Sequence, residues 1–322
     1  MIGLHDRIVA LSRELRDDGD PADAAAMLTL LRLLYRVGRE DLPLGRLFEG
    51  HVDARQIVAR YGSAEQHARA IEASAALGVW NADLPGDTLR IEDGRLHGGK
   101  SFASGAGILT QALVTVDVAG ERQLLLLDLA RTPPAIDRSV WQVTGMQRSE
   151  THVVRWDGAS LDPGDVVGAP GDYVREPWFS GGALRFAAVQ AGGIAALLDG
   201  VRDHLLNTGR AGDPHQAGRL ATLYALADGA ASAVRAAAAR WFVDDDDTRL
   251  ALVAAARAAV YTAGGQAIIV AQEAVGVQAL FTAHPLAAAI TDLSVYLRQP
   301  GPDAQRMRVG AAVADGLLRA AL

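Results

Sequence analysis

An aromatic ring and a hydroxyl group stand two residues apart in a segment that could present both to one ligand. The segment reads Gly99-Lys-Ser-Phe-Ala-Ser-Gly105 and carries Phe102 and Ser104. Side chains two residues apart on an extended chain face the same side, so we expect this ring and this hydroxyl to be able to contact one bound molecule. The alternative is that Phe102 packs in the core and Ser104 belongs to a turn.

Most other residue patterns that carry chemistry are absent from the sequence. The chain has no cysteine, which excludes disulfides, thiolate metal sites and cysteine nucleophiles. It has no His-Glu-x-x-His, Gly-x-Ser-x-Gly or Walker pattern, and its eight histidines are scattered singly. The acidic run 244–247 is expected to be a solvated turn with a helix cap. The glycine pair 264–265 follows no predicted strand, so helix packing explains it better than a dinucleotide loop. We therefore expect no metal site.

Charge and hydropathy limit the partners of this chain. The formal net charge is −7 and the pI is about 5.6. Phosphate binding needs clustered Lys and Arg, so nucleic acid is not an expected partner. No signal peptide is visible, and the apolar run 251–260 is broken by Arg257 and falls short of the ~20 residues of a membrane span. These features predict a soluble protein, and the absence of cysteine fits a reducing cytoplasm.

The elements that must position these residues fall into three stretches, of which the first is helical. Apolar residues recur at helical spacing before residue 79 and predict about four helices. Asp20 followed by Pro21 predicts the start of one helix, which Gly38 can end. The run Ser-Ala-Glu-Gln at 63–66 has capping-box spacing and predicts another helix, closed by Gly78.

The middle of the chain has the pattern of strands. We expect strands at about 88–92, 112–117, 122–129 and 152–157, separated by turns at 93–94, 119–120 and 157–158. Short strands without intervening helices predict an antiparallel sheet or barrel of modest size. The run Asp-Pro-Gly-Asp at 162–165 is expected to end it.

After Tyr173 the pattern is helical to the end of the chain. Long Ala-rich helices are predicted at about 179–207, 213–243 and 248–275, and two shorter helices follow. The predicted class is α+β. It comprises a short N-terminal helical domain at 1–78, a central antiparallel β-barrel-like domain at 79–168, and a C-terminal four-helix-bundle-like domain at 169–322.

Five segments in order resemble motifs of the acyl-CoA dehydrogenase superfamily. Residues 93–105 are similar to the stretch G-x-x-L-x-G-x-K-x-(W/F)-x-(T/S)-x-(G/A) of the family's β-domain. Residues 145–157 resemble its G-M-R-x-S-x-(T/S) turn with the strand that follows. Residues 283–292 resemble its H-P-L-E-R-x-x-R-D helix, and 41–51 and 61–66 resemble helices of its α-domain. Together they cover roughly residues 41–310, and they identify the chain as a divergent member with a shortened N-terminal domain.

The resemblance implies an FAD cofactor with contacts in the middle of the chain. Phe102 would lie against the flavin, and Ser104 would hydrogen-bond near its reactive nitrogen. Trp80 stands in the segment that replaces the family's T-E-P-x-x-G-S-D stretch, where it could stack on a ring or belong to the core.

Three further cofactor contacts follow from the resemblance in the last third of the chain. Arg210 and Gln216 would reach the FAD of a neighbouring subunit, although the loop between them is shorter than the family's and lacks its Phe. Gly276 is the one glycine that remains of the Q-x-x-G-G-x-G segment on the adenine side. The long C-terminal helices resemble those that build oligomers in the family, so a homodimer or homotetramer is expected.

The carboxylate base of an acyl-CoA dehydrogenase has no counterpart in this sequence. Removal of a proton α to a thioester carbonyl needs a carboxylate whose pKa is raised by desolvation. The resemblance places this Glu in a Y-E-G stretch, where residues 296–301 read Tyr-Leu-Arg-Gln-Pro-Gly. In other members the Glu precedes an Arg on the first long C-terminal helix, where Leu184 stands here. Glu176 lies further upstream and is a weak alternative.

Three functions remain open at this point. The first is an FAD-dependent oxidoreductase that acts on the CH–CH bond of an acyl thioester or related small molecule, with an unidentified base. The second is a flavin-dependent monooxygenase, which uses reduced flavin and oxygen, with Arg298 stabilising an anionic flavin or substrate. The third is a noncatalytic subunit in which FAD binding is weakened or lost. The expected partner is a small-molecule substrate, with acyl-CoA the class that the resemblance implies.

Overall fold

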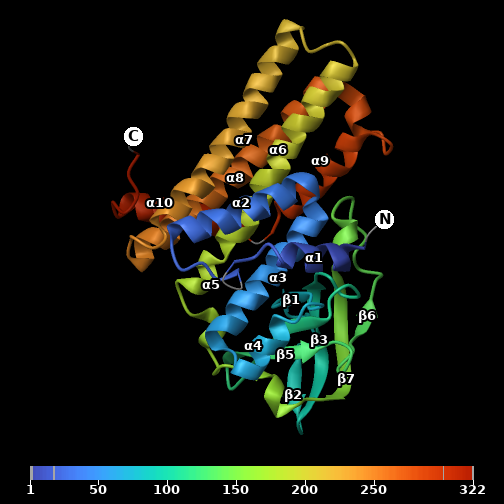
Figure 1. Cartoon of the computed structure of the whole chain (residues 1–322), viewed down its shortest axis with the longest axis vertical. Helices are drawn as coiled ribbons and strands as arrows, with labels where there is room; N and C mark the ends of the chain where they lie inside the picture. The colour runs from blue at the N-terminus through green and yellow to red at the C-terminus, as the bar shows by residue number, and fades with distance from the viewer. Residues whose placement is uncertain (1–2, 17–18, 300, 321–322) are drawn as a thin grey trace. The chain divides into compact units, whose positions relative to one another are not determined.

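The computed structural model describes residues 3–16, 19–299 and 301–320 and confirms the α+β class. Helices precede and follow a β-rich middle, as Figure 1 shows by its labels and colours. The helices are α1 (Leu4–Ser12), α2 (Ala24–Glu40), α3 (Leu42–Tyr61), α4 (Ala64–Ala70), α5 (Trp178–Gly181), α6 (Ala183–Asn207), α7 (Pro214–Arg240), α8 (Asp246–Val275), α9 (Pro285–Tyr296) and α10 (Pro302–Ala314).

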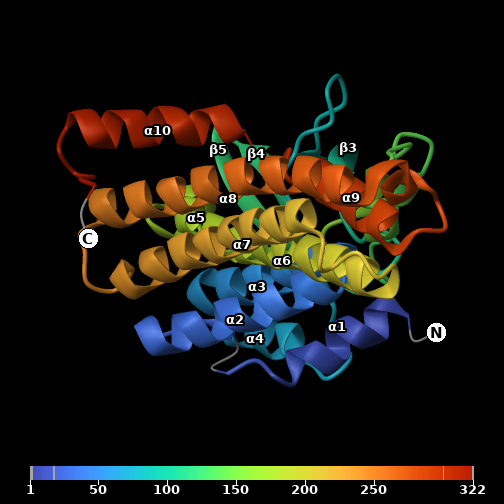
Figure 2. The same ribbon diagram turned by 90° about the horizontal axis from the view of Figure 1, so that it is seen from above.

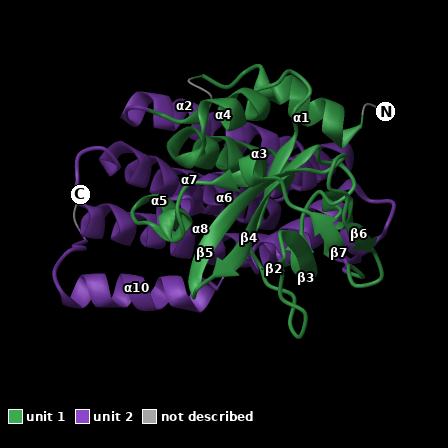
Figure 3. Ribbon diagram, turned by 90° about the horizontal axis from the view of Figure 1, so that it is seen from below, with its two compact units in different colours: residues 1–21, 46–142, 147–179 green, residues 22–45, 143–146, 180–322 purple. Residues whose placement is uncertain are grey.

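The chain divides into two compact units (Figure 3). Unit 1 comprises Met1–Pro21, Arg46–Gln142 and Gln147–Phe179, and unit 2 comprises Ala22–Gly45, Val143–Met146 and Ser180–Leu322. Along the sequence, helices, strands and helices follow one another in the expected order, with the strands between residues 77 and 167. The two units are groups of residues in contact with one another and not consecutive stretches of the chain, so the N-terminal helices are divided between them.

Unit 1 contains two four-stranded sheets. The first has the order β1-β4-β5-β8, with β1 (Leu77–Trp80), β4 (Gln111–Val118), β5 (Glu121–Asp128) and β8 (Val166–Val167). The second has the order β2-β3-β7-β6, with β2 (Arg90–Glu92), β3 (Arg95–Ala103), β7 (His152–Ser160) and β6 (Ala135–Asp137). The pairing is antiparallel except for β1 and β4, which are parallel. A wholly antiparallel arrangement was therefore wrong at β1, because a long connection lies between these two strands.

The turn residues decide where these strands end. Both residues of the 93–94 and 119–120 turns have positive φ, as two-residue hairpins require, so these two predictions are confirmed. The predicted turn at 157–158 is wrong, because β7 continues to Ser160. Gly158, with φ 75°, is the extra residue of a bulge between the pairs Leu96–Ala159 and His97–Asp157.

The helices of unit 1 bury an apolar face on the first sheet. Side chains of α3 and α4 share one core cluster with β1, β4 and β5, including Val58, Leu77, Leu113 and Leu126. Ser63 and Gln66 form both bonds of the predicted capping box of α4. Gly78 does not close that helix, because α4 ends at Ala70 and Gly78 belongs to β1.

Buried His51 joins three elements of unit 1. Its Nδ1 accepts the backbone N–H of Leu77 at 3.1 Å, and its Nε2 lies 2.8 Å from Ser12 Oγ. Because Nδ1 is an acceptor, Nε2 carries the proton and donates to the serine. Burial lowers the pKa of this imidazole to about 3, with a smaller contribution from Arg55. The ring is therefore a neutral connector between α1, α3 and β1.

Unit 2 is a helical bundle in which α6 contacts α2, α7, α8 and α9. Figure 2 shows α6, α7 and α8 side by side. Helix α2 begins after Asp23, which accepts the N–H of Ala26 at 2.8 Å, and not at the predicted pair 20–21. It also continues through Gly38, since this glycine is a packing residue: a Cβ there would lie 2.2 Å from the carbonyl oxygen of Val189 on α6.

The long helices α7 and α8 of unit 2 begin after capping aspartates, whereas α6 begins at Ala183 and not at about 179. Asp213 accepts from the N–H groups of His215 and Gln216, and Asp245, in the acidic run, accepts from Thr248. Gly264 lies inside α8 and faces the side chain of Leu297, so its packing role is confirmed.

Two stretches, Trp178–Asn207 and Asp246–Leu280, are long and apolar enough to cross a membrane by length and composition. The sequence-based statement that nothing reaches this length is corrected on that point. In the first, 72% of the apolar window is buried inside the protein, as in the core helix of a bundle.

Candidate functional site

A left-handed bulge at the end of β3 presents the aromatic ring that the sequence singled out. Lys100 pairs with Val154 and Ala103 with His152, so Ser101 and Phe102 together oppose one residue of β7. Phe102 has φ 51°, and 59% of the residue is exposed. A bulky residue with positive φ is rare, because the conformation costs roughly 1–3 kcal/mol. The fold of unit 1 thus holds this ring outside the core at an energetic cost.

Ser104 lies beside this bulge at the end of a chain of hydroxyl groups. Its Oγ accepts a hydrogen bond from Thr151 Oγ1 at 3.0 Å, and Thr151 Oγ1 lies 2.8 Å from Ser149 Oγ. All three side chains are buried. Because Ser104 Oγ is an acceptor in this chain, its own proton is available for a further acceptor.

Hydrogen bonds from two backbone N–H groups and from the indole of Trp80 fix the loop that carries Ser104. Gly105 N–H donates to Ser149 O at 2.8 Å, and Ala106 N–H donates to Glu150 O at 3.1 Å. Trp80 Nε1 donates to Ser104 O at 2.9 Å, and the Trp80 residue is 1% exposed. The structure therefore brings Trp80, Phe102 and Ser104 into one region and uses the indole of Trp80 to support the loop.

The expected same-face arrangement of Phe102 and Ser104 needs correction. It assumed extended backbone, whereas Phe102 has a left-handed conformation and β3 ends at Ala103. One side chain is exposed and the other buried. The two groups are neighbours because of the bulge and not because of strand alternation.

A buried charge cluster anchors the other part of β3. Lys100 is 0% exposed, and its Nζ donates to Asp83 Oδ1 at 2.7 Å and to Thr115 Oγ1 at 2.8 Å. Arg122 donates to both oxygens of the same Asp83 carboxylate. The bond from Arg122 lowers the pKa of Asp83 to about 2, with help from Lys100, while burial lowers the pKa of Lys100. The cluster connects β3, just before the bulge, to β4, β5 and the 81–83 segment.

In unit 2 the three predicted cofactor residues lie at helix ends. Arg210 is exposed in the loop between α6 and α7. Gln216 is 1% exposed, and its Oε1 has no hydrogen-bond partner among the described residues. Gly276 follows α8 with φ 77°, and a Cβ there would meet nothing within 4 Å, so its backbone angle requires glycine and its packing does not. Their contacts with a cofactor remain predictions.

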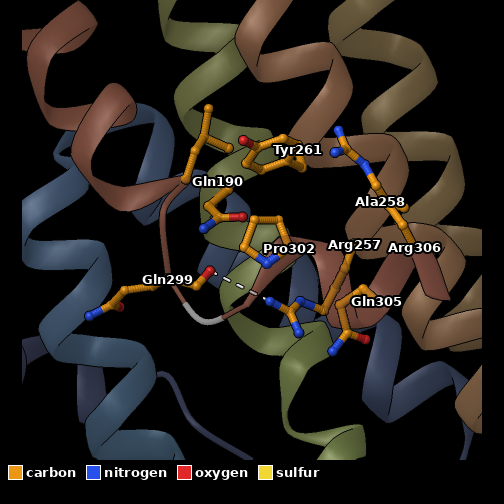
Figure 4. Close-up of a pocket in the computed structure, with 9 residues that line it drawn as sticks. Gln190, Arg257, Ala258, Tyr261, Gln299, Pro302, Gln305 and Arg306 are labelled. Atoms are coloured by element: carbon orange, nitrogen blue, oxygen red, sulfur yellow. Dashed lines mark hydrogen bonds between the residues drawn. The ribbon is translucent and has the colours of Figure 1, made fainter. Parts of the chain in front are cut away.

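The segment where the resemblance places the catalytic Glu lies beside a pocket in unit 2 (Figure 4). Leu297 and Gln299 line it, together with Gln190 of α6 and Tyr261 of α8. Arg298 Nη1 donates to the hydroxyl of Tyr261 at 2.6 Å. No acidic residue lines the pocket within the described part of the chain.

The other two candidate positions supply no base in this pocket. Leu184 is 1% exposed in α6, and Glu176 is exposed and belongs to unit 1. The structure therefore shows a cationic and amide-lined pocket at the position where a carboxylate was sought.

Two of the resembling motifs meet inside unit 2. Met146 N–H donates to Asp292 Oδ1 of α9. A Cβ on Gly145 would lie 2.1 Å from the carbonyl oxygen of Thr291, so the residue must be glycine for the 143–146 segment to reach α9. Residues 146 positions apart in sequence are thus parts of one local structure.

Several solved structures share the architecture of this protein over nearly the whole chain. TdsC from a Paenibacillus species, in complex with FMN and indole, has 17% identity and a TM-score of 0.79, covering 97% of each chain. Butyryl-CoA dehydrogenase from Megasphaera elsdenii has 14% identity and a TM-score of 0.80, covering 97% of this chain and 89% of that one. Glutaryl-CoA dehydrogenase has 18% identity and a TM-score of 0.80, covering 98% and 87%.

This chain has the acyl-CoA dehydrogenase fold. No family model and no curated protein matches its sequence. The fold expected from the resemblance is therefore confirmed by architecture at low sequence identity.

The residues of this acyl-CoA dehydrogenase-fold protein fit a flavin ring in part. The exposed ring of Phe102 is free to cover a planar heterocycle, and Ser104 retains a hydroxyl proton for an acceptor on it. The indole of Trp80 is enclosed and already bonded. A flavin therefore fits Phe102 and Ser104 better than it fits Trp80.

Sequence reasoning missed the residues that support this site. Thr151 and Ser149 lie inside the recognised motif at 145–152, but nothing in the sequence showed that their hydroxyls meet Ser104. In the pocket of unit 2, Arg257 could have been singled out from the sequence, because its single charge interrupts an apolar helical run. Tyr261, one turn later, could not.

Proposed function

We propose that this chain is a flavin-dependent oxidoreductase. The observation that carries the proposal is the strained, exposed Phe102 next to a hydroxyl chain that ends at Ser104, on this fold. Strained residues concentrate at functional sites, and an aromatic held outside the core needs a reason. The sequence resemblance implies FAD, and because one of the similar structures is a complex with FMN, we propose FAD or FMN as the flavin.

The chain's own residues have defined tasks in this proposal. The exposed ring of Phe102 and the hydroxyl of Ser104 would hold the flavin, the first by apolar contact and the second by donating a hydrogen bond. Thr151 and Ser149 hold the Ser104 oxygen in place. A flavin, when bound, would supply two-electron chemistry that the side chains of this cysteine-free chain do not provide.

The pocket in unit 2 favours a monooxygenase over a dehydrogenase. A guanidinium stays protonated at neutral pH and cannot remove a proton α to a thioester. The pocket contains Arg257 and Arg306 and no carboxylate among its described lining residues. A reaction of reduced flavin with oxygen needs no such base. TdsC, one of the similar structures, is a dibenzothiophene monooxygenase, and its coverage of 97% of both chains also supports this reaction class.

An acyl-CoA dehydrogenase-like reaction on a CH–CH bond is the second candidate. It is supported by TM-scores of 0.80 with the butyryl-CoA and glutaryl-CoA enzymes. It requires a base from outside the residues described in the pocket. Acyl-CoA is the substrate class to test for it.

Flavin loading tests the shared proposal, and reactivity separates the two reactions. The absorbance of the purified protein at about 450 nm is measured before and after addition of FAD or FMN. Bleaching by acyl-CoA substrates supports the dehydrogenase. Oxygen consumption that follows only after chemical reduction supports the monooxygenase. A colourless protein that neither flavin can load contradicts both and favours a noncatalytic subunit.

A variant pair links the result to the site. Phe102→Ala removes the exposed ring and is expected to weaken flavin binding about tenfold, since stacking of a ring contributes roughly 1–1.5 kcal/mol. Val140→Ala removes an equally exposed apolar side chain elsewhere in unit 1 and is expected to change nothing. Equal flavin affinity in both variants would remove Phe102 from the site.

A further inference from the structure

The pocket of unit 2 is lined by two arginines and by no acidic residue among the described ones. Helix α8 contributes Arg257 and Tyr261, and α10 contributes Gln305 and Arg306. In Figure 4 the guanidinium of Arg306 lies beside the ring of Tyr261, and that of Arg257 points toward the carbonyl oxygen of Gln299. This charge lies in a protein whose formal net charge is −7.

Arg257 is the deepest of these groups. The residue is 8% exposed, and its guanidinium carbon lies 4.5 Å from the centroid of the Phe186 ring. Its Nη2 lies 3.5 Å from the carbonyl oxygen of Gln299. Burial lowers the pKa of this guanidinium to about 10, so the group is still a cation at neutral pH. A buried cation raises the affinity of its surroundings for an anion.

Two more arginines lie near the ring of Tyr261. The guanidinium carbon of Arg306 lies 5.0 Å and that of Arg298 lies 5.7 Å from the Tyr261 ring centroid. Arg298 also donates to the phenol oxygen, which leaves the phenol proton to donate to another acceptor. Asp303 pairs with Arg306 at 3.4 Å, but its carboxylate is 88% exposed, so solvent weakens this neutralisation.

The remaining polar groups suit an acceptor-rich ligand. The amides of Gln190 and Gln305 line the same pocket, and Gln190 Nε2 is already bonded to Tyr296 O at 3.0 Å. The pocket has a volume of about 10 Å³, enough for roughly one water molecule. One oxygen of an anionic group therefore fits inside, while the rest of the ligand lies at the mouth.

We propose that this pocket binds the oxoanion group of a small molecule, a carboxylate or a phosphate, between Arg257, Arg306 and the hydroxyl of Tyr261. Guanidinium groups present paired N–H donors that match both of these groups. The site lies within unit 2 and does not depend on the proposed flavin.

Anion binding to the full-length protein without added flavin tests this site. Calorimetric titration with sodium phosphate and, separately, with sodium acetate is compared with sodium chloride at equal ionic strength. We expect saturable binding of phosphate or acetate with a dissociation constant below about 10 mM, together with a rise in the midpoint of thermal unfolding. The anion that binds more tightly distinguishes a phosphate ligand from a carboxylate ligand.

Three variants assign the binding to the pocket. Arg257→Gln is expected to weaken it tenfold or more, because a charge-assisted hydrogen bond is lost. Arg306→Gln is expected to weaken it about fivefold, and it remains informative if the buried variant does not fold, since its side chain is 52% exposed. Arg202→Gln on α6 removes an equally exposed arginine, paired with Asp203, and is the control.

The outcomes decide the proposal in both directions. Weakened binding in Arg306→Gln with unchanged binding in Arg202→Gln supports the site. The proposal is overturned if neither anion binds the wild-type protein, or if both exposed-arginine variants bind as it does. Because no flavin is added, this result is separate from that of the loading experiment.

Discussion

At the scale of single residues, the candidate site depends on a conformation that its sequence hides. A phenylalanine with positive φ is costly, yet the fold holds Phe102 in that state at the end of β3. The residue types of the motif were predictable, and so was the presence of Ser104 beside it. The bulge was not, because no glycine marks it. Nor was the hydroxyl chain, because Thr151 reaches Ser104 only through long-range pairing of β3 and β7.

The strained backbone of Phe102 predicts that one substitution will raise stability and lower flavin affinity. Phe102→Gly removes the penalty of the left-handed conformation and little burial, since 59% of the residue is exposed. We expect the free energy of unfolding of the flavin-free protein to rise by about 1 kcal/mol, measured by urea denaturation. Flavin affinity should fall in the same variant, because the ring is lost.

A hairpin residue provides the matched control for Phe102→Gly. Ala119 has φ 53° in the turn between β4 and β5. Ala119→Gly is expected to stabilise the protein by a similar amount of about 1 kcal/mol and to leave flavin affinity unchanged. Lower stability of Phe102→Gly than of the wild type would show that the ring packs usefully in the flavin-free protein.

The buried imidazole of His51 predicts how the stability of the protein depends on pH. Its pKa is about 3 in the folded protein and about 6.5 in an unfolded chain. The unfolded state therefore binds a proton first as the pH falls, and the contribution of this group to stability is complete above pH ~6.5 and decreases below it. The expected loss approaches about 1.4 kcal/mol per pH unit.

Urea denaturation between pH ~6.5 and ~4.5 measures this slope. His51→Gln cannot titrate in this range, so its stability should depend less steeply on pH than that of the wild type. The wild type and His51→Gln would show the same dependence of stability on pH if the pKa of His51 in the folded protein were as high as in the unfolded chain, or higher.

At the scale of elements, local signals located helices well and their ends less well. Capping residues with a hydrogen-bonding side chain marked true starts at Ser63, Asp213 and Asp245. Glycine was the less dependable sign, because its meaning depends on the neighbour across the interface. Gly38 and Gly264 lie inside helices where another element approaches closely, and that contact cannot be read from a local pattern.

The packing role of Gly38 predicts opposite effects for two identical substitutions. Gly38→Ala would place a methyl group 2.2 Å from Val189 O, so α2 and α6 would have to separate. We expect a loss of about 2 kcal/mol or more in unfolding free energy. Gly229→Ala in exposed α7 meets nothing within 4 Å and should stabilise the protein by about 1 kcal/mol through helix propensity.

Thermal and urea unfolding of both variants compare these effects directly. Stabilisation by Gly38→Ala would mean that the close approach of α2 to α6 is not required. Destabilisation by Gly229→Ala would indicate that this face of α7 is covered in the working protein.

At the scale of the whole molecule, the order of helices, strands and helices could be predicted, while the grouping into units could not. Periodicity reports which face of an element is apolar, but not which distant element covers it. Helix α2 lies early in the chain and joins the later helices in unit 2. The overall fold was nevertheless recognisable from short motifs, because glycine and polar residues at fixed places, such as Gly145 against α9, are required by the backbone itself.

Helix α8 supports the expectation of a homo-oligomer. The apolar window in the stretch Asp246–Leu280 has a mean hydropathy of 1.3, but only 44% of it is buried within one chain. Exposed apolar side chains on α7, on α8 and just beyond it include Tyr224 at 63%, Ile269 at 48% and Phe281 at 55%. An apolar surface of this kind is stabilised by association with another chain. We therefore predict a dimer or tetramer of the 33.8 kDa chain.

Light scattering coupled to size-exclusion chromatography measures this mass. The double variant Tyr224→Lys, Ile269→Lys should shift the protein toward the monomer, since burying two charges in an interface costs several kcal/mol. Val140→Lys, on an equally exposed apolar residue of unit 1, should leave the mass unchanged. A wild-type protein that is monomeric at all concentrations would contradict the prediction and show that this exposed apolar surface does not drive self-association.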